Sequence, residues 1–219
     1  MVKNKEITDV EIISSYMNYV LENESSPKSV YAFAKASNFE ESLFYNYFGS
    51  FESLEKAIFK AFFNNAMQAL ENSEEYPTFD SRNKLLSFYF TFFENLSANR
   101  SYILMVLNDN KNHLNKLKTL SELKMSFVQY INGLEIETID FKHKNITQFQ
   151  QKSIQESAWV QLLMTLQFWL NDSSVAFEKT DIFIEKSVNT SFDIMATTPL
   201  KSMIDFGKFL YKEKMNLNL

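Results

Sequence analysis

The residues of this sequence best suited to chemistry are hydroxyl-bearing side chains near the N-terminus. Tyr45 and Tyr47 lie in the stretch EESLFYNYFGSFESL at residues 40–54, and Ser29 precedes a short apolar run. Tyrosine and serine hydroxyls can donate hydrogen bonds to phosphate oxygens, and a helix start adds backbone N–H groups that attract anions. These tyrosines could instead simply cover an amphipathic surface, an interpretation that we rank below phosphate contact.

Catalytic and metal-binding chemistry has little support. The two histidines, His113 and His143, lie far apart in polar, lysine-rich stretches. Asp109 and His113 are four residues apart and supply two metal ligands at most, and a pair at that spacing is usually surface chemistry. The chain has no cysteine, and it shows no nucleophile elbow, HExxH or P-loop pattern. We therefore predict no enzyme activity, no catalytic residue, no bound metal and no cofactor.

The composition predicts an all-α fold. The 219 residues are 45% hydrophobic, enough for a core, and include only three glycines and three prolines. Strands need more turn residues than this, so long helices with short connections remain. The net charge of −5 argues mildly against bulk attraction to nucleic acid. The N-terminus has no signal-peptide pattern, and the most apolar segment, residues 158–170, is too short to cross a bilayer. We expect a cytoplasmic protein without a membrane partner.

Capping residues and apolar residues at helical spacing predict the individual elements. Thr8 and Glu11 have the form of a capping box at the start of the first helix. Asn38 suits a left-handed turn after the second helix, and Ser50 caps the fourth. The predicted helices cover residues 9–22, 28–36, 40–47, 51–71, 81–98, 102–108, 112–132, 147–172, 181–196 and 200–214, with an extended connection at 134–145.

A series of short motifs runs through residues 29–54. They are Ser29-Val30, Phe33-Ala34, Ser37-Asn38-Phe39-Glu40, Phe44-Tyr45-x-x-Phe48 and Phe51-x-x-Leu54. In type and spacing this pattern resembles the DNA-binding domain of the TetR family of bacterial transcriptional repressors, and the resemblance continues weakly through residues 168–188. It implies a helix-turn-helix domain at residues 1–50, a connecting helix at about 51–71, and a helical ligand-binding and dimerisation domain over residues 51–219.

The resemblance also implies a function. The family's members are homodimers whose heads bind double-stranded operator DNA and whose second domain binds a small molecule, here expected to be hydrophobic. The DNA-contacting residues expected here are Lys28, Ser29, Glu41, Ser42, Leu43, Tyr45, Asn46 and Tyr47. Glu41 could accept a hydrogen bond from cytosine N4 or merely favour the helix dipole, and we rank these equally. Independently of the family, six residues can form a small core under these helices: Val30, Phe33, Ala34, Phe39, Phe44 and Phe48.

Four positions depart from the family pattern. Asn38 replaces the usual glycine of the turn, Glu40 a serine, Leu43 a small recognition residue and Phe51 a phosphate-binding lysine. Residues 1–60 carry six lysines and nine acidic side chains, a net charge of −3. Phosphate neutralisation supplies most non-specific affinity, so we expect weak DNA binding with a shallow salt dependence. The alternative is a TetR-fold lipid-binding or small-molecule-binding protein that has lost DNA binding, as in the lipid-binding protein of coenzyme Q biosynthesis.

The helices after residue 64 are rich in phenylalanine and methionine. Helix 147–172 is apolar on nearly all sides, which predicts two packing partners. The resemblance to the TetR family implies what these partners are, a ligand-binding core on one side and a second subunit on the other. Gln161 and Gln167 lie among these apolar residues, and a buried amide needs partners that a ligand could supply. An aromatic stripe is nevertheless more often core than pocket. The predicted pocket residues are Phe63, Met67, Phe88, Phe92, Met105, Phe127, Trp159, Leu163 and Gln167. The predicted dimer interface consists of Val160, Met164, Phe168, Phe183, Ser187, Ser191 and Ile194.

Overall fold

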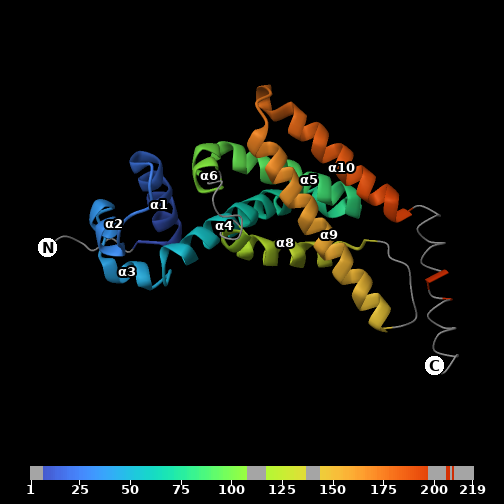
Figure 1. The fold of residues 1–219 in the computed structure, drawn as a ribbon, viewed down its shortest axis with the longest axis horizontal. Helices are drawn as coiled ribbons and strands as arrows, with labels where there is room; N and C mark the ends of the chain where they lie inside the picture. The colour runs from blue at the N-terminus through green and yellow to red at the C-terminus, as the bar shows by residue number, and fades with distance from the viewer. Residues whose placement is uncertain (1–6, 108–116, 137–143, 197–205, 208, 210–219) are drawn as a thin grey trace. The chain divides into compact units, whose positions relative to one another are not determined.

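The computed structural model describes residues 7–107, 117–136, 144–196, 206–207 and 209. These residues form helices joined by short connections and contain no strand, which confirms the predicted all-α fold (Figure 1). The elements are α1 (Asp9–Asn23), α2 (Val30–Ala36), α3 (Glu41–Tyr45), α4 (Phe51–Glu71), η1 (Tyr76–Thr78), α5 (Ser81–Ala98), α6 (Arg100–Leu107), α8 (Ser121–Gly133), α9 (Lys144–Asn171), η2 (Val175–Phe177) and α10 (Glu178–Ala196).

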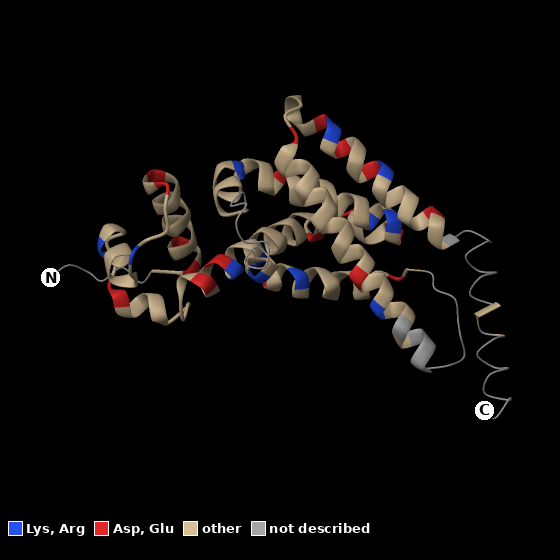
Figure 2. Cartoon of the chain, in the orientation of Figure 1, with Lys and Arg blue, Asp and Glu red and all other residues tan. Residues whose placement is uncertain are grey.

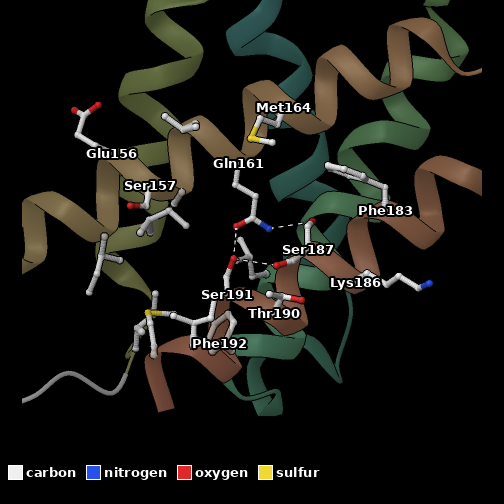
Figure 3. A pocket seen from close by; sticks show the side chains of 18 of the residues that line it. Glu156, Ser157, Gln161, Met164, Phe183, Lys186, Ser187, Thr190, Ser191 and Phe192 are labelled. Atoms are coloured by element: carbon white, nitrogen blue, oxygen red, sulfur yellow. Dashed lines mark hydrogen bonds between the residues drawn. The ribbon is translucent and has the colours of Figure 1, made fainter. Parts of the chain in front are cut away.

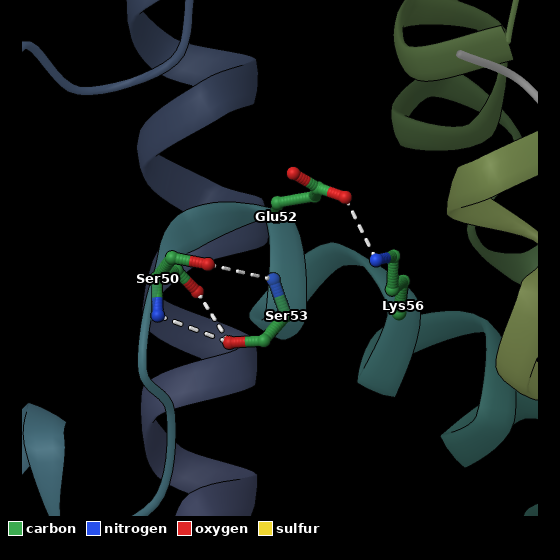
Figure 4. Close-up of polar contacts among 4 residues, drawn as sticks. All are labelled: Ser50, Glu52, Ser53 and Lys56. Carbon is green, nitrogen blue, oxygen red and sulfur yellow. Dashed lines mark hydrogen bonds and ion pairs between the residues drawn. The ribbon is translucent and has the colours of Figure 1, made fainter. Parts of the chain in front are cut away.

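Capping residues set the starts of the N-terminal helices. The Thr8 hydroxyl accepts from the backbone N–H of Glu11 at 3.2 Å, and the Glu11 carboxylate accepts from the backbone N–H of Thr8 at 2.9 Å. Ser50 and Ser53 form the same reciprocal pair at the start of α4 (Figure 4). Each box satisfies backbone N–H groups that the first turn of a helix leaves without partners. The predicted capping box at Thr8 and the predicted cap at Ser50 are therefore confirmed.

Several helix limits differ from the predicted ones. Helix α2 begins at Val30 because Ser29 is its N-cap, and α3 is shorter than predicted because Glu40 precedes it as N-cap and Asn46 follows it as C-cap. Helix α9 begins at Lys144 and α10 at Glu178, each three residues before its predicted start. Parts of the predicted connection 134–145 and most of the predicted last helix, 200–214, lie outside the described residues.

The chain packs as two compact units. One comprises Met1–Asn72 with Thr91–Gln129, and the other comprises Ser73–Phe90 with Tyr130–Leu219. The predicted boundary after residue 50 lies inside the first unit, and a separate head of 50 residues stays a prediction. In the second unit, the fully buried side chains include Phe88, Trp169, Ile184 and Val188. The core of this unit therefore draws on α5, α9 and α10 together.

Asp172 fixes the turn between α9 and α10. Its carboxylate accepts from the backbone N–H and the hydroxyl of Ser174, at 2.8 and 2.7 Å, and from the backbone N–H and hydroxyl of Thr180, at 3.0 and 2.7 Å. Burial alone would raise the pKa of Asp172, but these hydrogen bonds lower it to about 2. Ala176 and Phe177 within this turn have φ angles of 52° and 59°. The turn is thus tight and held by an ionised side chain.

Candidate functional sites on the helix-turn-helix and on helices α9 and α10

A tight turn joins α2 to α3. Asn38 has a φ angle of 58°, the left-handed conformation predicted for it. The backbone N–H of the next residue, Phe39, donates to the carbonyl oxygen of Ala34 at 3.0 Å, which satisfies one of the last carbonyls of α2. At the other end of α2, the Ser29 hydroxyl accepts from the backbone N–H of Ala32 at 3.1 Å. Both ends of α2 are therefore fixed by local hydrogen bonds.

The predicted core under α2 and α3 is present in large part. Phe33, Ala34, Phe44 and Phe48 are buried, while Val30 and Phe39 are only half-buried. The Phe33 ring lies at the centre of an aromatic cluster, with ring centroids 5.7 Å from Tyr16, 5.5 Å from Phe39 and 6.3 Å from Phe44, all edge-on. Edge-to-face pairs at these separations are favourable beyond the area that they bury. This cluster holds α2 and α3 against α1.

The predicted DNA-contacting residues lie on the outside of this core. Tyr45 and Tyr47 have 54% and 48% of their surface exposed, although the neighbouring Phe44 and Phe48 are buried. Their rings rest on those phenylalanines, at centroid distances of 5.5 and 6.4 Å. The others that are exposed are Lys28, Ser29, Ser42 and Asn46, whereas Glu41 and Leu43 are half-buried. The two tyrosine hydroxyls are therefore presented to solvent from rings that are braced against the core.

Phe51 is part of this core. Its ring stacks on Tyr16, with centroids 5.3 Å apart and an angle of 28° between the rings, and lies 5.5 Å from Phe44 and 5.8 Å from Phe33. Tyr16 itself is fully buried. The position at which the family pattern has a phosphate-binding lysine is thus filled by a packing residue, and sequence reasoning missed Tyr16 as its partner.

Acidic side chains outnumber cations around α1 to α4 (Figure 2). Lys56 is held by Glu52 in an ion pair of 2.7 Å one turn away on α4 (Figure 4). Lys60 lies 4.0 Å from Glu122 on α8. Within the described part of these helices, the exposed lysines without an ion pair are Lys28 and Lys35, both at α2. Few cations are therefore available to neutralise phosphate.

The second candidate site is a groove of about 1160 Å³ on α9 and α10. All seven predicted dimer-interface residues line it, together with residues of α5 and α8 such as Leu85 and Ile131. Val160 and Met164 leave 51% and 57% of their surface exposed, and Ile182 and Ile194 are about half exposed. A contiguous exposed apolar face of this kind marks an interaction surface in soluble proteins.

A polar cluster lies within this apolar groove. The Gln161 side-chain N–H donates to the Ser187 hydroxyl at 3.2 Å, and the Ser191 hydroxyl lies 3.1 Å from the Gln161 carbonyl oxygen (Figure 3). The Ser187 hydroxyl also donates to the carbonyl oxygen of Ile184, and the Ser191 hydroxyl to that of Ser187. Gln161 is half-buried. The hydrogen-bond partners of its side-chain amide are the hydroxyls of Ser187 and Ser191, both on α10.

The nine predicted pocket residues do not line the large groove. Phe63, Phe88, Phe92, Phe127 and Trp159 are buried, Met67 and Leu163 are half-buried, and Met105 is exposed. Gln167 is exposed and lines a smaller hollow of about 450 Å³ beside Asp172 and Phe183. The expectation that Gln167 is a buried amide therefore does not hold, and a pocket formed by these nine residues stays a prediction.

A comparison with known protein families shows to which family this chain belongs. The family model described as "Tetracyclin repressor-like, C-terminal domain" matches residues 84–210, which is more than half of the chain. The chain belongs to the TetR family. No curated protein sequence matches it. The match covers the second half of the molecule, where the sequence alone shows only a weak resemblance, and it agrees with the helix-turn-helix pattern at the other end of the chain.

Membership of the TetR family points to a regulator and not to an enzyme. Among the described residues, no three side chains of the types that bind metal ions are grouped together. No helix in the same residues is long and apolar enough to span a membrane. The two surfaces that stand out in this TetR-family chain are thus the exposed face of α3 and the groove on α9 and α10.

Proposed function

We propose that this chain is a homodimeric, cytoplasmic transcriptional regulator that represses by binding operator DNA. The observation that carries this proposal is the face of α3 and its C-terminal end. Tyr45, Asn46 and Tyr47 are exposed there, while Phe44 and Phe48 anchor the same segment in the core. Hydroxyl and amide groups on a fixed short helix are suited to phosphate and base-edge contacts in a major groove.

The groove on α9 and α10 supports the dimeric part of the proposal. A second copy docked there would cover Val160, Met164, Phe168 and Ile194, each of which leaves more than a third of its surface exposed in a single chain. Two heads held by one interface can occupy two half-sites of a symmetric operator. The nonpolar area thereby removed from water provides the main driving force for association.

A hydrophobic small molecule is the proposed effector. It can change operator affinity only if it binds the DNA-competent and DNA-free conformations with different affinities. The predicted pocket residues lie mostly in cores, so an effector that reaches them must displace or separate packed side chains. Release of operator DNA by an added apolar compound, with no change in the dimer, tests this part of the proposal.

One set of observations favours a second function, a ligand-binding protein that no longer binds DNA. Phe51 packs against Tyr16 where the family pattern has a lysine, and Glu52 neutralises Lys56. The six lysines and nine acidic side chains of residues 1–60 give this region a net charge of −3. A head of this charge gains little from counterion release on DNA.

Capture of sheared genomic DNA from the source organism separates the two functions. The purified protein is incubated with the fragments at about 50 mM and about 200 mM salt, between which phosphate-driven binding changes strongly. Enrichment of a few sites supports the regulator and supplies the operator sequence. A double variant, Tyr45→Phe with Tyr47→Phe, is the matched control and should lose the enrichment. A folded, dimeric wild-type protein that enriches no site at either salt concentration supports the ligand-binding function instead.

A further inference from the structure

Gln161 lies at the middle of the α9–α10 groove. The lining residues span 150–168 on α9 and 179–195 on α10. Gln161 lies near the midpoint of the first range and Ser187 near that of the second, and the two are joined by the 3.2 Å hydrogen bond. Figure 3 shows Gln161 between Glu156 on one side and Phe183 and Lys186 on the other. The central pair of the groove is therefore polar, while exposed apolar side chains lie to either side.

The Gln161 amide has hydrogen-bonding capacity to spare. A glutamine side chain offers two N–H donors and two acceptor lone pairs. Among the described residues, one N–H is used by Ser187. The carbonyl oxygen is approached by the Ser191 hydroxyl, whose single proton is shared with the carbonyl oxygen of Ser187. At least one donor and one acceptor site thus remain for a group outside the chain, and an amide that has one of each can pair with a copy of itself.

The charges toward the two ends of the groove select one orientation for a second copy. Three charged residues line the groove: Glu156 toward one end, Lys179 at the other end, and Lys186 beside the central Ser187. Helices α9 and α10 run antiparallel, because Phe168 stacks on Phe183 at 4.7 Å while Gln161, earlier on α9, bonds to Ser187, later on α10. A two-fold axis parallel to α9 would place like charges opposite each other. An axis perpendicular to α9 brings the Glu156 end of one copy to the Lys179 end of the other. In such a symmetric interface, residues on the axis contact their own counterparts.

We infer that the two-fold axis of the homodimer runs through Gln161 and Ser187, and that the Gln161 amides of the two copies hydrogen-bond to each other. This inference rests on the homodimer proposed above. It adds the residue that sets how the α9 helices of the two copies are aligned along each other. A polar pair at the centre of an apolar interface fixes alignment because every shifted arrangement leaves an amide buried without a partner.

Single-cysteine variants of the full chain test the position of the axis, since the natural sequence has no cysteine. A disulfide requires two Cα atoms within about 7 Å. Gln161→Cys should therefore form a disulfide-linked dimer under mild oxidation. Ser157→Cys, one turn away on the same lined face, is the matched control. Its distance from its own copy would be about 12 Å along the helix, so we expect cross-linking at least tenfold slower.

A charge substitution tests the amide pairing. Gln161→Glu places two carboxylates against each other at the axis, while the Ser187 and Ser191 hydroxyls keep their backbone acceptors and α10 stays intact. We expect the dimer dissociation constant, measured by sedimentation at neutral pH, to rise at least tenfold. Gln68→Glu, an exposed position on α4, carries the same charge change and should leave the constant unaltered.

The outcomes of these experiments distinguish a failure of the homodimer from a failure of the proposed axis or of the Gln161 pairing. A wild-type protein that sediments as a monomer at micromolar concentration overturns both the homodimer and the role of Gln161. A dimeric wild type in which Ser157→Cys cross-links as fast as Gln161→Cys overturns the position of the axis alone. A dimer that tolerates Gln161→Glu as well as Gln68→Glu overturns the amide pairing.

Discussion

The Tyr16 hydroxyl donates a hydrogen bond of 2.7 Å to the Glu55 carboxylate and so joins α1 to α4. Tyr16 is fully buried, and burial raises the pKa of Glu55 above its ordinary value, although the hydrogen bond from Tyr16 opposes that shift. The helix that leads out of the helix-turn-helix thus carries, within its first turns, a carboxyl group that is more easily protonated when the protein is folded.

This pair predicts a pH dependence of stability. Because the pKa of Glu55 is higher in the folded protein, the folded state binds the proton more tightly, and the free energy of unfolding falls as the pH rises above the ordinary glutamate value. In the variant Glu55→Gln the side chain cannot ionise, so its unfolding free energy does not fall with rising pH for this reason. We expect the variant to gain stability relative to wild type as the pH rises above the ordinary glutamate value, as measured by urea unfolding at a series of pH values. A stability difference that does not vary with pH would contradict the assignment.

The hydrogen bond itself is tested by Tyr16→Phe. The substitution removes the donor and leaves a partly buried carboxylate without it, which should cost about 1–3 kcal/mol of unfolding free energy at neutral pH. The Phe33 and Phe51 ring contacts of residue 16 remain available to the phenylalanine. In the Glu55→Gln background the same substitution should cost less, and equal costs in both backgrounds would argue against the pair.

The tyrosine hydroxyls on α3 and its C-terminal end are predicted to contact phosphate. Tyr45→Phe and Tyr47→Phe each remove one hydroxyl from an exposed ring and should leave the unfolding transition unchanged. One lost hydrogen bond of about 0.5–1.5 kcal/mol corresponds to a roughly two- to tenfold weaker affinity for operator DNA. Anisotropy titrations with a recovered operator fragment, at fixed salt, measure this loss. Tyr31→Phe, on exposed Tyr31 of α2, is the control and should bind like wild type.

Phe51 is predicted to act through packing. Replacing it with lysine, the residue that the family pattern has there, removes ring contacts with Tyr16, Phe33 and Phe44. We expect Phe51→Lys to lose about 2 kcal/mol or more of unfolding free energy, and Phe51→Leu to lose less because it keeps an apolar side chain. Thermal unfolding of both variants measures the difference. A lysine variant as stable as the leucine variant would show that the ring contacts contribute little.

Asp172 is predicted to stabilise the α9–α10 turn in its ionised form. Its pKa of about 2 lies below the ordinary value of 3.8, so its contribution is present above that value and is lost as the pH falls toward 2. Asp172→Ala removes the acceptor for Ser174 and Thr180 and should cost about 1–2 kcal/mol at neutral pH, the range found for lost helix caps. Asp9→Ala, on exposed Asp9 at the start of α1, should cost less in the same unfolding assay.

Local signals account for what could be predicted from the sequence. The capping box at Thr8, the left-handed Asn38 and the cap at Ser50 depend on a few neighbouring residues, and each is present as predicted. Helical spacing together with the family resemblance predicted the seven dimer-interface residues, and all of them line one groove, although the dimer itself stays a prediction. Gln167 is exposed although a buried amide was expected there, because periodicity cannot say which side of an all-apolar helix is covered. The role of Phe51 depends on Tyr16, 35 residues earlier in the chain, so no local pattern reveals it.

The Asp172 turn lowers the conformational entropy that a docking partner of the groove would cost this chain. The turn holds α9 and α10 by hydrogen bonds within the chain, and Arg82 on α5 ties the far end of α10 through an ion pair of 2.7 Å to Asp193. Both ends of the groove are thus preorganised before anything docks. A preformed surface loses little conformational entropy on binding, so more of the hydrophobic free energy of the groove is available as affinity.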